Sequence, residues 1–409
     1  MTLDEIAHQI LKLRADGQRV TLLAVCPNSD AVLEAAIKTA QGNNCPMLFA
    51  ATLNQVDRDG GYTQMTPAAF VSRMNELGSL YNCTVPLLPC LDHGGPWLRD
   101  SHTRDLLDLA NTIAEVKLSL EACLDAGYAL LHIDPTVDRT LGQGEMLHID
   151  TVVKRTVELI AHAERHRTSR GLPQVFYEVG TEEVHGGLAD RSTFARFLSE
   201  LRKGLVEAGL SSVWPCFIVA KVGTDLHTTT FDSDLARELS AEVVTLGSLI
   251  KGHYTDWVAN PEDYPRSGMG GANVGPEFTA TELSALEELC QREQMQPENN
   301  GRESGESGFK QALKTAVVSS NRWRKWLTDA EKGRDFEALD PERQEWLVAT
   351  GARYVWTHPD VLSAREVLYA NLRTAEFDPH DFVIDRICRN IQKYIDAFNL
   401  RDTMDLLGR

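Results

Sequence analysis

The segment PLLPCLDHGGPW, residues 86–97, carries the clearest indication of how this chain folds. It is apolar from Pro86 to Leu91, and it then changes abruptly to Asp92, His93 and two glycines. A strand that is apolar along its whole length is typical of a parallel sheet covered on both faces. The polar tip has two interpretations. Asp92 and His93 either cap the following turn or belong to a metal or acid–base site at the mouth of an α/β fold.

The same pattern recurs along the chain and predicts eight strand–helix units. Apolar runs precede helical patterns at residues 19–26, 46–53, 85–92, 128–134, 174–180, 214–222, 248–254 and 268–275. After the first run, Ser29 is placed to cap a helix whose apolar positions share one face. Eight such units favour a (β/α)8 TIM barrel over a doubly wound open sheet. The segment AVCPNSDA (24–31) also lacks the glycines of a dinucleotide-binding loop.

The organisation of the chain beyond these units predicts an appended helical region. Residues 1–296 are expected to form the barrel, beginning with an amphipathic, acidic helix rather than a signal peptide. Residues 297–308, PENNGRESGESG, are polar and rich in Gly and Ser, which indicates a flexible loop or linker. Residues 309–409 show helical patterns to the end and are expected to form a C-terminal helical extension.

Composition narrows the class of protein. The net charge of −18 over 409 residues argues against nucleic acid and anionic membranes as partners, because both require a basic face. No apolar run approaches the roughly 18 residues that a membrane span needs. The eight cysteines are scattered without a CxxC pair, which favours reduced thiols over a disulfide framework or a cysteine zinc site. We therefore expect a cytoplasmic globular protein.

Residues able to bind a metal or transfer a proton gather where the predicted strands end. A barrel places its active site at the carboxyl ends of its strands. The residues found there are Asp92, His93, Asp134, Glu178, Glu182, Glu183, His185, Asp225, His227, His253 and Asp256. A single histidine at such a place is more often structural, but several together with a carboxylate favour a divalent cation, since burying them without partners costs several kcal/mol. A set of three histidines and one carboxylate suits zinc, with manganese or cobalt as alternatives. Asp92 is then not needed as a ligand and is a candidate general base.

Two further segments of the same rim are candidates for substrate binding. Asn54 and Gln55 follow the second strand, and their neutral amides suit the hydroxyl groups of a sugar. The segment GMGGANVG (268–275) contains Gly271 and Asn273 and is expected at the loop after strand eight, where barrels commonly bind phosphate through backbone N–H groups. The alternative is that these glycines only shape a turn.

Several segments resemble the Z-type subunit family of tagatose-1,6-bisphosphate aldolase over nearly the whole chain. The matching segments are ATLNQVDRDGGYTQMTPAAF (51–70), CLDHGGP (90–96), LLHIDPT (130–136), GTEE (180–183), GHYTDW (252–257), NVGPEFT (273–279), RYVWTHP (353–359) and VLYANL (367–372). The resemblance implies a TIM barrel related to the class II aldolases, with a helical C-terminal part. Members have been described as non-catalytic aldolase subunits, as tagatose-6-phosphate kinases and as ketose-6-phosphate 4-epimerases. The chain contains no GxxxxGK[ST] loop, so the kinase description finds no support here.

The resemblance also implies roles for individual residues. His93, His227 and His253 match the metal-binding histidines of the class II aldolases, and Asp92 matches their proton-transferring aspartate. Glu182 matches a strand-five carboxylate with a catalytic or metal-binding role. Asp134 and Asp256 are expected at the substrate. Two positions depart from the family pattern and concern the phosphate contacts: Asn273 stands where a lysine is expected, and PNSDA (27–31) lacks an expected histidine.

We therefore expect a metal-dependent ketose-6-phosphate 4-epimerase that interconverts tagatose 6-phosphate and fructose 6-phosphate by retro-aldol chemistry, in galactitol and tagatose catabolism. Two alternatives remain open. One is a non-catalytic partner that stabilises a separate aldolase catalytic subunit, and the other is aldol cleavage of a ketose bisphosphate. A homo-oligomer that binds a ketose or ketose phosphate is expected. The candidates for phosphate binding are Lys221, Lys251, Arg266 and Arg99.

Overall fold

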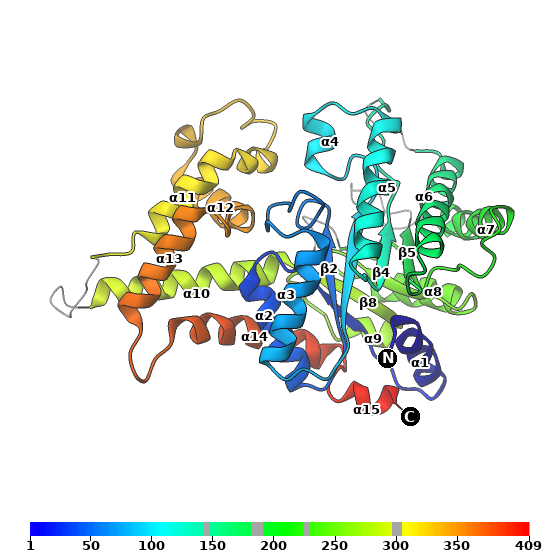
Figure 1. Ribbon diagram of the computed structural model, residues 1–409, viewed down its shortest axis with the longest axis horizontal. Coiled ribbons are helices and arrows are strands. Elements are labelled where there is room, and N and C mark those ends of the chain that lie inside the picture. Colours follow the sequence, from blue (N-terminus) through cyan, green and yellow to red (C-terminus); the bar gives the residue numbers. More distant parts are fainter. Residues whose placement is uncertain (143–144, 146, 181–190, 225–228, 297–304, 409) are drawn as a thin grey trace.

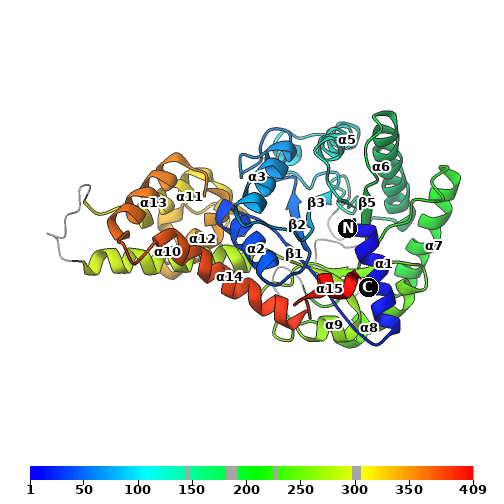
Figure 2. The same ribbon diagram turned by 60° about the horizontal axis from the view of Figure 1, so that its bottom comes forward.

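The chain forms a closed parallel barrel of eight strands surrounded by helices (Figures 1 and 2). The computed structural model describes residues 1–142, 145, 147–180, 191–224, 229–296 and 305–408. The strands follow one another around the barrel in chain order, and β8 closes on β1. Their bounds are β1 (Leu22–Val25), β2 (Met47–Thr52), β3 (Leu87–Gly94), β4 (Leu130–Ile133), β5 (Phe176–Gly180), β6 (Phe217–Val219), β7 (Leu249–Gly252) and β8 (Met269–Val274). The predicted TIM barrel is confirmed.

The strands are buried on both faces, as their apolar runs predicted. Every residue of β1, β4, β6, β7 and β8 is buried. One face of each strand fills the barrel interior and the other meets the surrounding helices, so neither face alternates toward water. The barrel therefore places polar groups inside only where they have partners or form a site.

Strand β3 differs from its predicted end at residue 92, because it continues through Asp92 and His93 to Gly94. Its pairing with β4 is regular at Leu91 and then shifts, so that Gly94 pairs with Ile133. His93, inside this irregularity, has a φ of 50°, in the left-handed region that residues other than glycine seldom adopt. Such local irregularities redirect side chains and gather at functional sites.

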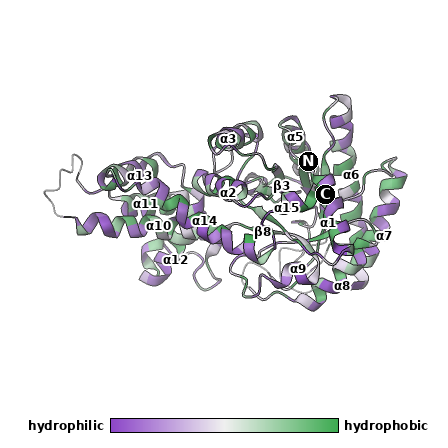
Figure 3. Cartoon of the chain, turned by 90° about the horizontal axis from the view of Figure 1, so that it is seen from below, coloured by the Kyte–Doolittle hydropathy of each residue, from purple (hydrophilic) through white to green (hydrophobic). Residues whose placement is uncertain are grey.

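Helices cover the outside of the barrel, and Ser29 caps one of them as predicted. The Ser29 hydroxyl accepts a hydrogen bond from the backbone of Val32 at 3.1 Å. The helices before the extension are α1 (Leu3–Ala15), α2 (Asp30–Gly42), α3 (Pro67–Leu80), α4 (Asp100–Arg104), α5 (Leu109–Asp125), α6 (Ile149–Ser169), α7 (Arg191–Glu207), α8 (Ser233–Val244), α9 (Asp263–Ser267) and α10 (Pro276–Met295). Hydrophilic and hydrophobic residues alternate along these outer helices (Figure 3).

The C-terminal region is helical as predicted, and it returns to the barrel. Its elements are α11 (Phe309–Ser320), η1 (Arg322–Trp326), η2 (Phe336–Ala338), α12 (Pro341–Gly351), η3 (Ala352–Tyr354), α13 (Pro359–Leu372), α14 (Pro379–Ala397) and α15 (Thr403–Leu407). Helix α14 packs against α2 and α10, so its path leads back beside the barrel (Figure 2). Most of the predicted linker, residues 297–308, lies outside the described residues.

Two further features concern the cysteines and the helices. All eight cysteines are unpaired thiols. Among the described residues, no helix combines the length and the apolar character that crossing a lipid bilayer requires.

Candidate active site

One carboxylate and three imidazoles meet at the carboxyl end of the barrel. Asp92, His93, His132 and His253 each offer a ligand atom, and these atoms lie within 4.8 Å of one another. The rings of the three histidines are 4.9 to 5.0 Å apart, centroid to centroid. The residues come from β3, from β4 and from the end of β7. The structure thus brings together His93 and His253, which the strand-end pattern singled out, and adds His132.

The sequence analysis missed His132 because this residue lies inside a predicted strand and not after it. It is the third residue of β4, within the run YALLHID (128–134). Residues two apart in a strand point to the same side, so His132 and Asp134 share a face. That alternation, together with a histidine in an otherwise apolar run, is the signal that would have identified His132.

Hydrogen bonds fix the orientation of the cluster. The imidazole Nδ1 of His93 lies 2.7 Å from a carboxylate oxygen of Asp134, whose other oxygen accepts from the hydroxyl of Thr136 at 2.5 Å. The backbone N–H of His93 donates to Nδ1 of His132 at 3.1 Å, and that nitrogen is also 3.3 Å from Asp92. Asp134 therefore stands behind His93, where it orients the ring, and does not line the pocket itself. Partners of this kind commonly position metal-binding histidines.

Burial and charge determine the ionisation of the two aspartates. Burial alone would raise the pKa of Asp92, but the nearby His93 and His253 hold that pKa well below its ordinary value. Burial would likewise raise the pKa of Asp134, but its hydrogen bond with His93 and the charge of that ring lower it to about 2. Both carboxyl groups are therefore ionised at neutral pH, and Asp92 is able to accept a proton.

A buried ion pair lies beneath the cluster. One oxygen of Glu178, in β5, is 2.8 Å from Nε2 of His253, and the other accepts from the Lys251 ammonium at 2.6 Å. Neither side chain of the Lys251–Glu178 pair is more than 1% exposed. Burial alone would raise the pKa of Glu178, but the charges of Lys251 and His132 and the contact with His253 lower it to about 2. Glu178 thus orients His253 and balances Lys251.

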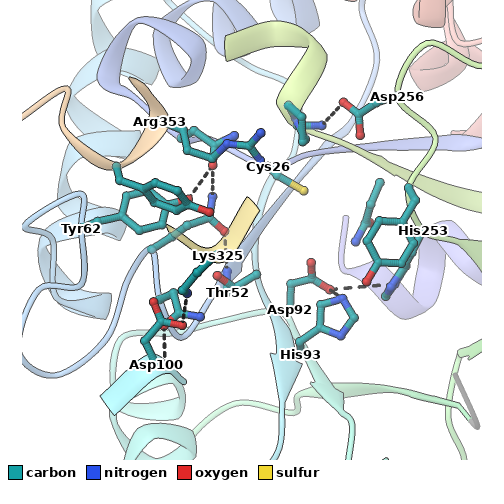
Figure 4. A pocket seen from close by; sticks show the side chains of 18 of the residues that line it. Cys26, Thr52, Tyr62, Asp92, His93, Asp100, His253, Asp256, Lys325 and Arg353 are labelled. Atoms are coloured by element: carbon teal, nitrogen blue, oxygen red, sulfur yellow. Dashed lines mark hydrogen bonds and ion pairs between the residues drawn. The ribbon is translucent and has the colours of Figure 1, made fainter. Parts of the chain in front are cut away.

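The cluster opens into a cavity of about 250 Å³ (Figure 4). Its walls come from the loops after several strands and from the C-terminal extension. The lining residues are Cys26, Asn28, Thr52, Asn54, Gln55, Tyr62, Asp92, His93, Asp100, His253, Tyr254, Asp256, Asn273, Gly275, Pro276, Lys325, Trp326, Arg353 and Tyr354. Most of the predicted substrate-binding residues therefore lie at one cavity.

The amides of Asn54 and Gln55 line the cavity but already have partners in the protein. Asn54 donates to the carbonyl of Leu98 at 3.0 Å and accepts from the backbone of Asp100 at 2.8 Å. Gln55 accepts from the backbone of Thr52 at 2.7 Å. These contacts hold the loop after β2 in place. The main role of Asn54 and Gln55 is therefore to stabilise the cavity wall.

Asn273 has a different environment. Its side chain is 4% exposed, and neither its amide nitrogen nor its amide oxygen has a hydrogen-bond partner among the described residues. A buried amide without partners is unfavourable unless a ligand or water satisfies it. Asn273 is thus the amide in this wall best placed to bind a substrate hydroxyl.

Residues 268–275 were predicted as the eighth strand and also considered as a phosphate-binding loop, and residues 269–274 of this segment form β8. The strand prediction is confirmed, and the loop expected around Gly271 is wrong. Gly271 lies within β8, and a side chain there would come within 3.2 Å of the Lys251 side chain, so the glycine makes room for Lys251. Beyond β8, the backbone N–H groups of Gly275 and Glu277 donate to Asp256 at 3.0 and 2.7 Å. Burial raises the pKa of Asp256 to about 6. A carboxylate of the protein therefore occupies the N–H groups expected to bind phosphate.

Three of the predicted phosphate-binding cations are also engaged elsewhere. Lys251 is paired with Glu178 inside the barrel. Arg266 precedes β8 and so lies at the opposite, amino-terminal end of the strands. Arg99 pairs with Asp57 at 3.2 Å, beside the loop after β2.

Several predicted residues lie outside the described part of the chain. These are Glu182, Glu183, His185, Asp225 and His227. The proposed metal ligands His227 and Glu182 therefore remain predictions. Thr224, just before the undescribed residues 225–228, donates to the backbone carbonyl of His253 at 2.9 Å.

The donor set of the cluster fits a divalent metal ion. Three imidazole nitrogens and one carboxylate oxygen are ligands that zinc prefers, and manganese and cobalt accept them as well. Their mutual distances, within 4.8 Å, allow a single ion to contact all of them. His93 and His253 would hold the ion, with His132 or Asp92 beside them.

The chain is similar to proteins of sugar-phosphate metabolism. Residues 7–396 match the sequence model of a family described as D-tagatose-1,6-bisphosphate aldolase subunit GatZ/KbaZ-like. A relative from Agrobacterium fabrum (strain C58 / ATCC 33970), named D-tagatose 6-phosphate 4-epimerase, is 27% identical over 389 residues, covering 90% of this chain and 87% of that protein.

Two solved structures share the fold. A protein from Sinorhizobium meliloti 1021, described as a probable tagatose 6 phosphate kinase, superposes with a TM-score of 0.76 and 21% identity, covering 92% of this chain and 100% of that one. A fructose-bisphosphate aldolase from Campylobacter jejuni gives a TM-score of 0.57 and 10% identity, covering 98% and 96% of the two chains. At these identities the likeness establishes the fold alone.

Proposed function

Because the chain belongs to the D-tagatose-1,6-bisphosphate aldolase subunit GatZ/KbaZ-like family, we propose that it is a metal-dependent ketose-6-phosphate 4-epimerase that interconverts tagatose 6-phosphate and fructose 6-phosphate. The observation that carries this proposal is the cluster of Asp92, His93, His132 and His253, of which Asp92, His93 and His253 line a cavity. The relative named D-tagatose 6-phosphate 4-epimerase supports the choice of reaction.

A retro-aldol route uses the residues of this site. A divalent metal ion bound by the histidines would polarise the C2 carbonyl of the ketose. Asp92 accepts the proton of the C4 hydroxyl group. The C3–C4 bond then breaks, its electron pair moves toward C2 to give the enediolate of a three-carbon ketone, and C4 becomes the aldehyde carbon of a triose phosphate.

Inversion at C4 follows from a rotation of the aldehyde within the cavity. The enediolate carbon C3 adds to the opposite face of the aldehyde, and Asp92 returns the proton to the new C4 oxygen. No electron acceptor is needed, because the substrate and the product are isomers. Asn273, without a partner among the described residues, is placed to hold a hydroxyl group of the sugar during this rotation. Glu182 remains the other candidate for proton transfer and a candidate metal ligand.

The test is to incubate purified protein with tagatose 6-phosphate, with a chelator or with added zinc, manganese or cobalt, and to measure fructose 6-phosphate. Asp92→Asn is expected to lower kcat by about 100-fold or more, the usual contribution of a general base. The matched control is Asp105→Asn, an aspartate that pairs with Arg104 on the surface. Wild-type protein that forms no fructose 6-phosphate with any of the three metals would rule out the proposal.

The family description, which names an aldolase subunit, favours a second candidate function. In that case the chain stabilises a separate catalytic subunit, copurifies with it and has no turnover alone. Cleavage of a ketose bisphosphate would instead release triose phosphate, which a separate incubation with tagatose 1,6-bisphosphate and a triose-phosphate readout detects. A cytoplasmic location and a homo-oligomeric state also remain predictions, to be checked by fractionation and by light scattering.

A further inference from the structure

The cavity has a second wall that comes from the C-terminal extension and is basic. Lys325 and Arg353 line the cavity itself, and the guanidinium of Arg322 lies close to the ring of Tyr62, which lines the cavity as well. Figure 4 shows Arg353, Tyr62, Lys325 and Asp100 on one side of the cavity, and Asp92, His93 and His253 on the other. Three cations at one place are notable in a chain whose net charge is −18.

Arg353 is held in position without a carboxylate partner. Its Nε donates to the backbone carbonyl of Thr350 at 3.0 Å, and its guanidinium lies 5.4 Å from the ring of Trp326. Within the part of the chain that the structure describes, no acidic side chain forms a salt bridge with Arg353, and its two terminal nitrogens donate no hydrogen bond. A guanidinium held in this way presents a pair of donors that matches a phosphate group.

The other two cations share a single carboxylate. Lys325 forms an ion pair with Asp100, and Arg322 lies 3.6 Å from the same aspartate. The guanidinium of Arg322 also stands 5.5 Å from the ring of Tyr62 and 5.0 Å from that of Tyr354. Among the described residues, Asp100 is the one carboxylate that forms ion pairs with these cations, so the side of the cavity formed by the extension carries a local excess of positive charge that attracts anions.

The extension is fastened to the barrel at the point where the cations enter. The ring of Tyr62, in the loop after β2, meets that of Tyr354 edge-on at 5.3 Å. The hydroxyl of Thr357 donates to the carbonyl of Tyr62 at 3.0 Å. Contacts with the barrel therefore fix the position of Arg353. A ligand that contacts both Arg353 and the residues of the barrel needs the two to be held at a constant distance.

We propose that Arg353 and Lys325 of the extension bind the phosphate group of the ketose 6-phosphate, with Arg322 supporting them. This inference rests on the proposed function for the identity of the sugar. The reacting carbons would lie at Asp92 and the histidines, and the 6-phosphate would lie across the cavity at the extension. The barrel does not supply this subsite through the N–H groups of Gly275 and Glu277, because Asp256 already accepts both of them.

The first experiment compares kcat/KM for tagatose 6-phosphate and for unphosphorylated tagatose. Arg353→Gln is expected to lower kcat/KM for the phosphorylated sugar by about 100-fold, mainly through KM, and to change the value for tagatose by less than about threefold, because an Arg–phosphate contact is charge-assisted. Arg353→Lys is expected to restore part of the loss. The control is Arg334→Gln, an exposed arginine of the extension that does not line the cavity.

The second experiment measures binding of inorganic phosphate by calorimetry, without any turnover. Wild-type protein is expected to bind phosphate, and Arg353→Gln and Lys325→Met each to weaken binding by about tenfold or more. Lys325 is exposed, so its substitution leaves the core intact. If the wild type binds phosphate but converts no sugar, the proposed function fails and the subsite stands. If both variants bind phosphate as tightly as the wild type does, or if the wild type does not bind phosphate, the subsite is refuted.

Discussion

Replacing Glu178 with glutamine removes the carboxylate that neutralises a lysine inside the barrel. Lys251 and Glu178 are 1% and 0% exposed, and their charged atoms are 2.6 Å apart. The substitution preserves the volume of the side chain but leaves the ammonium group without its counter-charge. Breaking a buried pair from one side typically costs about 3–5 kcal/mol of unfolding free energy.

The pKa of Glu178 gives an independent estimate of the same quantity. The folded protein lowers this pKa from 4.5 to about 2, so the folded state favours the ionised form. Each pKa unit corresponds to about 1.4 kcal/mol, which gives about 3 kcal/mol of stability. Because the pKa is lowered by folding, this stability is present above about pH 4.5 and is lost as the pH falls toward 2. The two estimates agree.

The assay is urea unfolding of the wild type, Glu178→Gln, Lys251→Met and the double variant, with a chelator present so that no cation on His253 contributes. Lys251→Met is expected to cost less than Glu178→Gln, because Glu178 keeps its contact with His253 at 2.8 Å. The double variant is expected to recover part of the loss, with a coupling energy of about 2 kcal/mol. The stability of Glu178→Gln should also fall less steeply than that of the wild type between pH 5 and 3. Additivity of the two single changes within about 0.5 kcal/mol would refute the reasoning.

Three further predictions concern the site and its surroundings. Gly95→Ala places a Cβ 1.6 Å from the backbone oxygen of Asp134, so it should displace Asp134 and lower the epimerase activity at least about tenfold. Gly42→Ala, whose Cβ would have nothing within 4 Å, serves as the neutral control in the same activity assay. Burial raises the pKa of Asp256 from 3.8 to about 6. Ionisation of this group should therefore lower the free energy of unfolding by about 3 kcal/mol as the pH rises from 4 to 7. Urea unfolding of Asp256→Asn should not show this decrease. Zinc at 100 times its Kd should raise the unfolding free energy of chelator-treated protein by about 2.7 kcal/mol, visible as a higher Tm, and an unchanged Tm would contradict the proposed metal site.

The strands and the barrel could be predicted because their signals are local. Each strand is a short apolar run followed by a helix with one apolar face, and neither pattern depends on distant residues. The sequence also predicted that His93 and His253 lie at one rim, because the parallel strands of a barrel have their carboxyl ends at the same side. His132 was missed because a rule that looks only after the strands passes over a residue within one.

The segment at 268–275 shows where local signals are ambiguous. Its place after seven strand–helix units predicted the eighth strand, while its glycines also suggested a phosphate-binding loop. It forms β8, where the absence of side chains admits Leu249 and Lys251 of the neighbouring strand. A Cβ on Gly270 would lie 2.4 Å from that of Leu249. The need for glycine thus arises from the packing of β7 against β8, which no short window of sequence contains.

The amino-acid sequence by itself determined the eight strands, the class of fold and several chemical groups at the carboxyl rim, among them Asp92, His93 and His253, because hydrophobic periodicity and strand ends are properties of neighbouring residues. Only the tertiary structure decided which groups share one cavity. Tyr62 and Tyr354 are far apart in the chain, yet their contact brings Arg353 over the barrel mouth. Such a contact depends on the packing of two surfaces, and the pattern of residues on either one does not specify it.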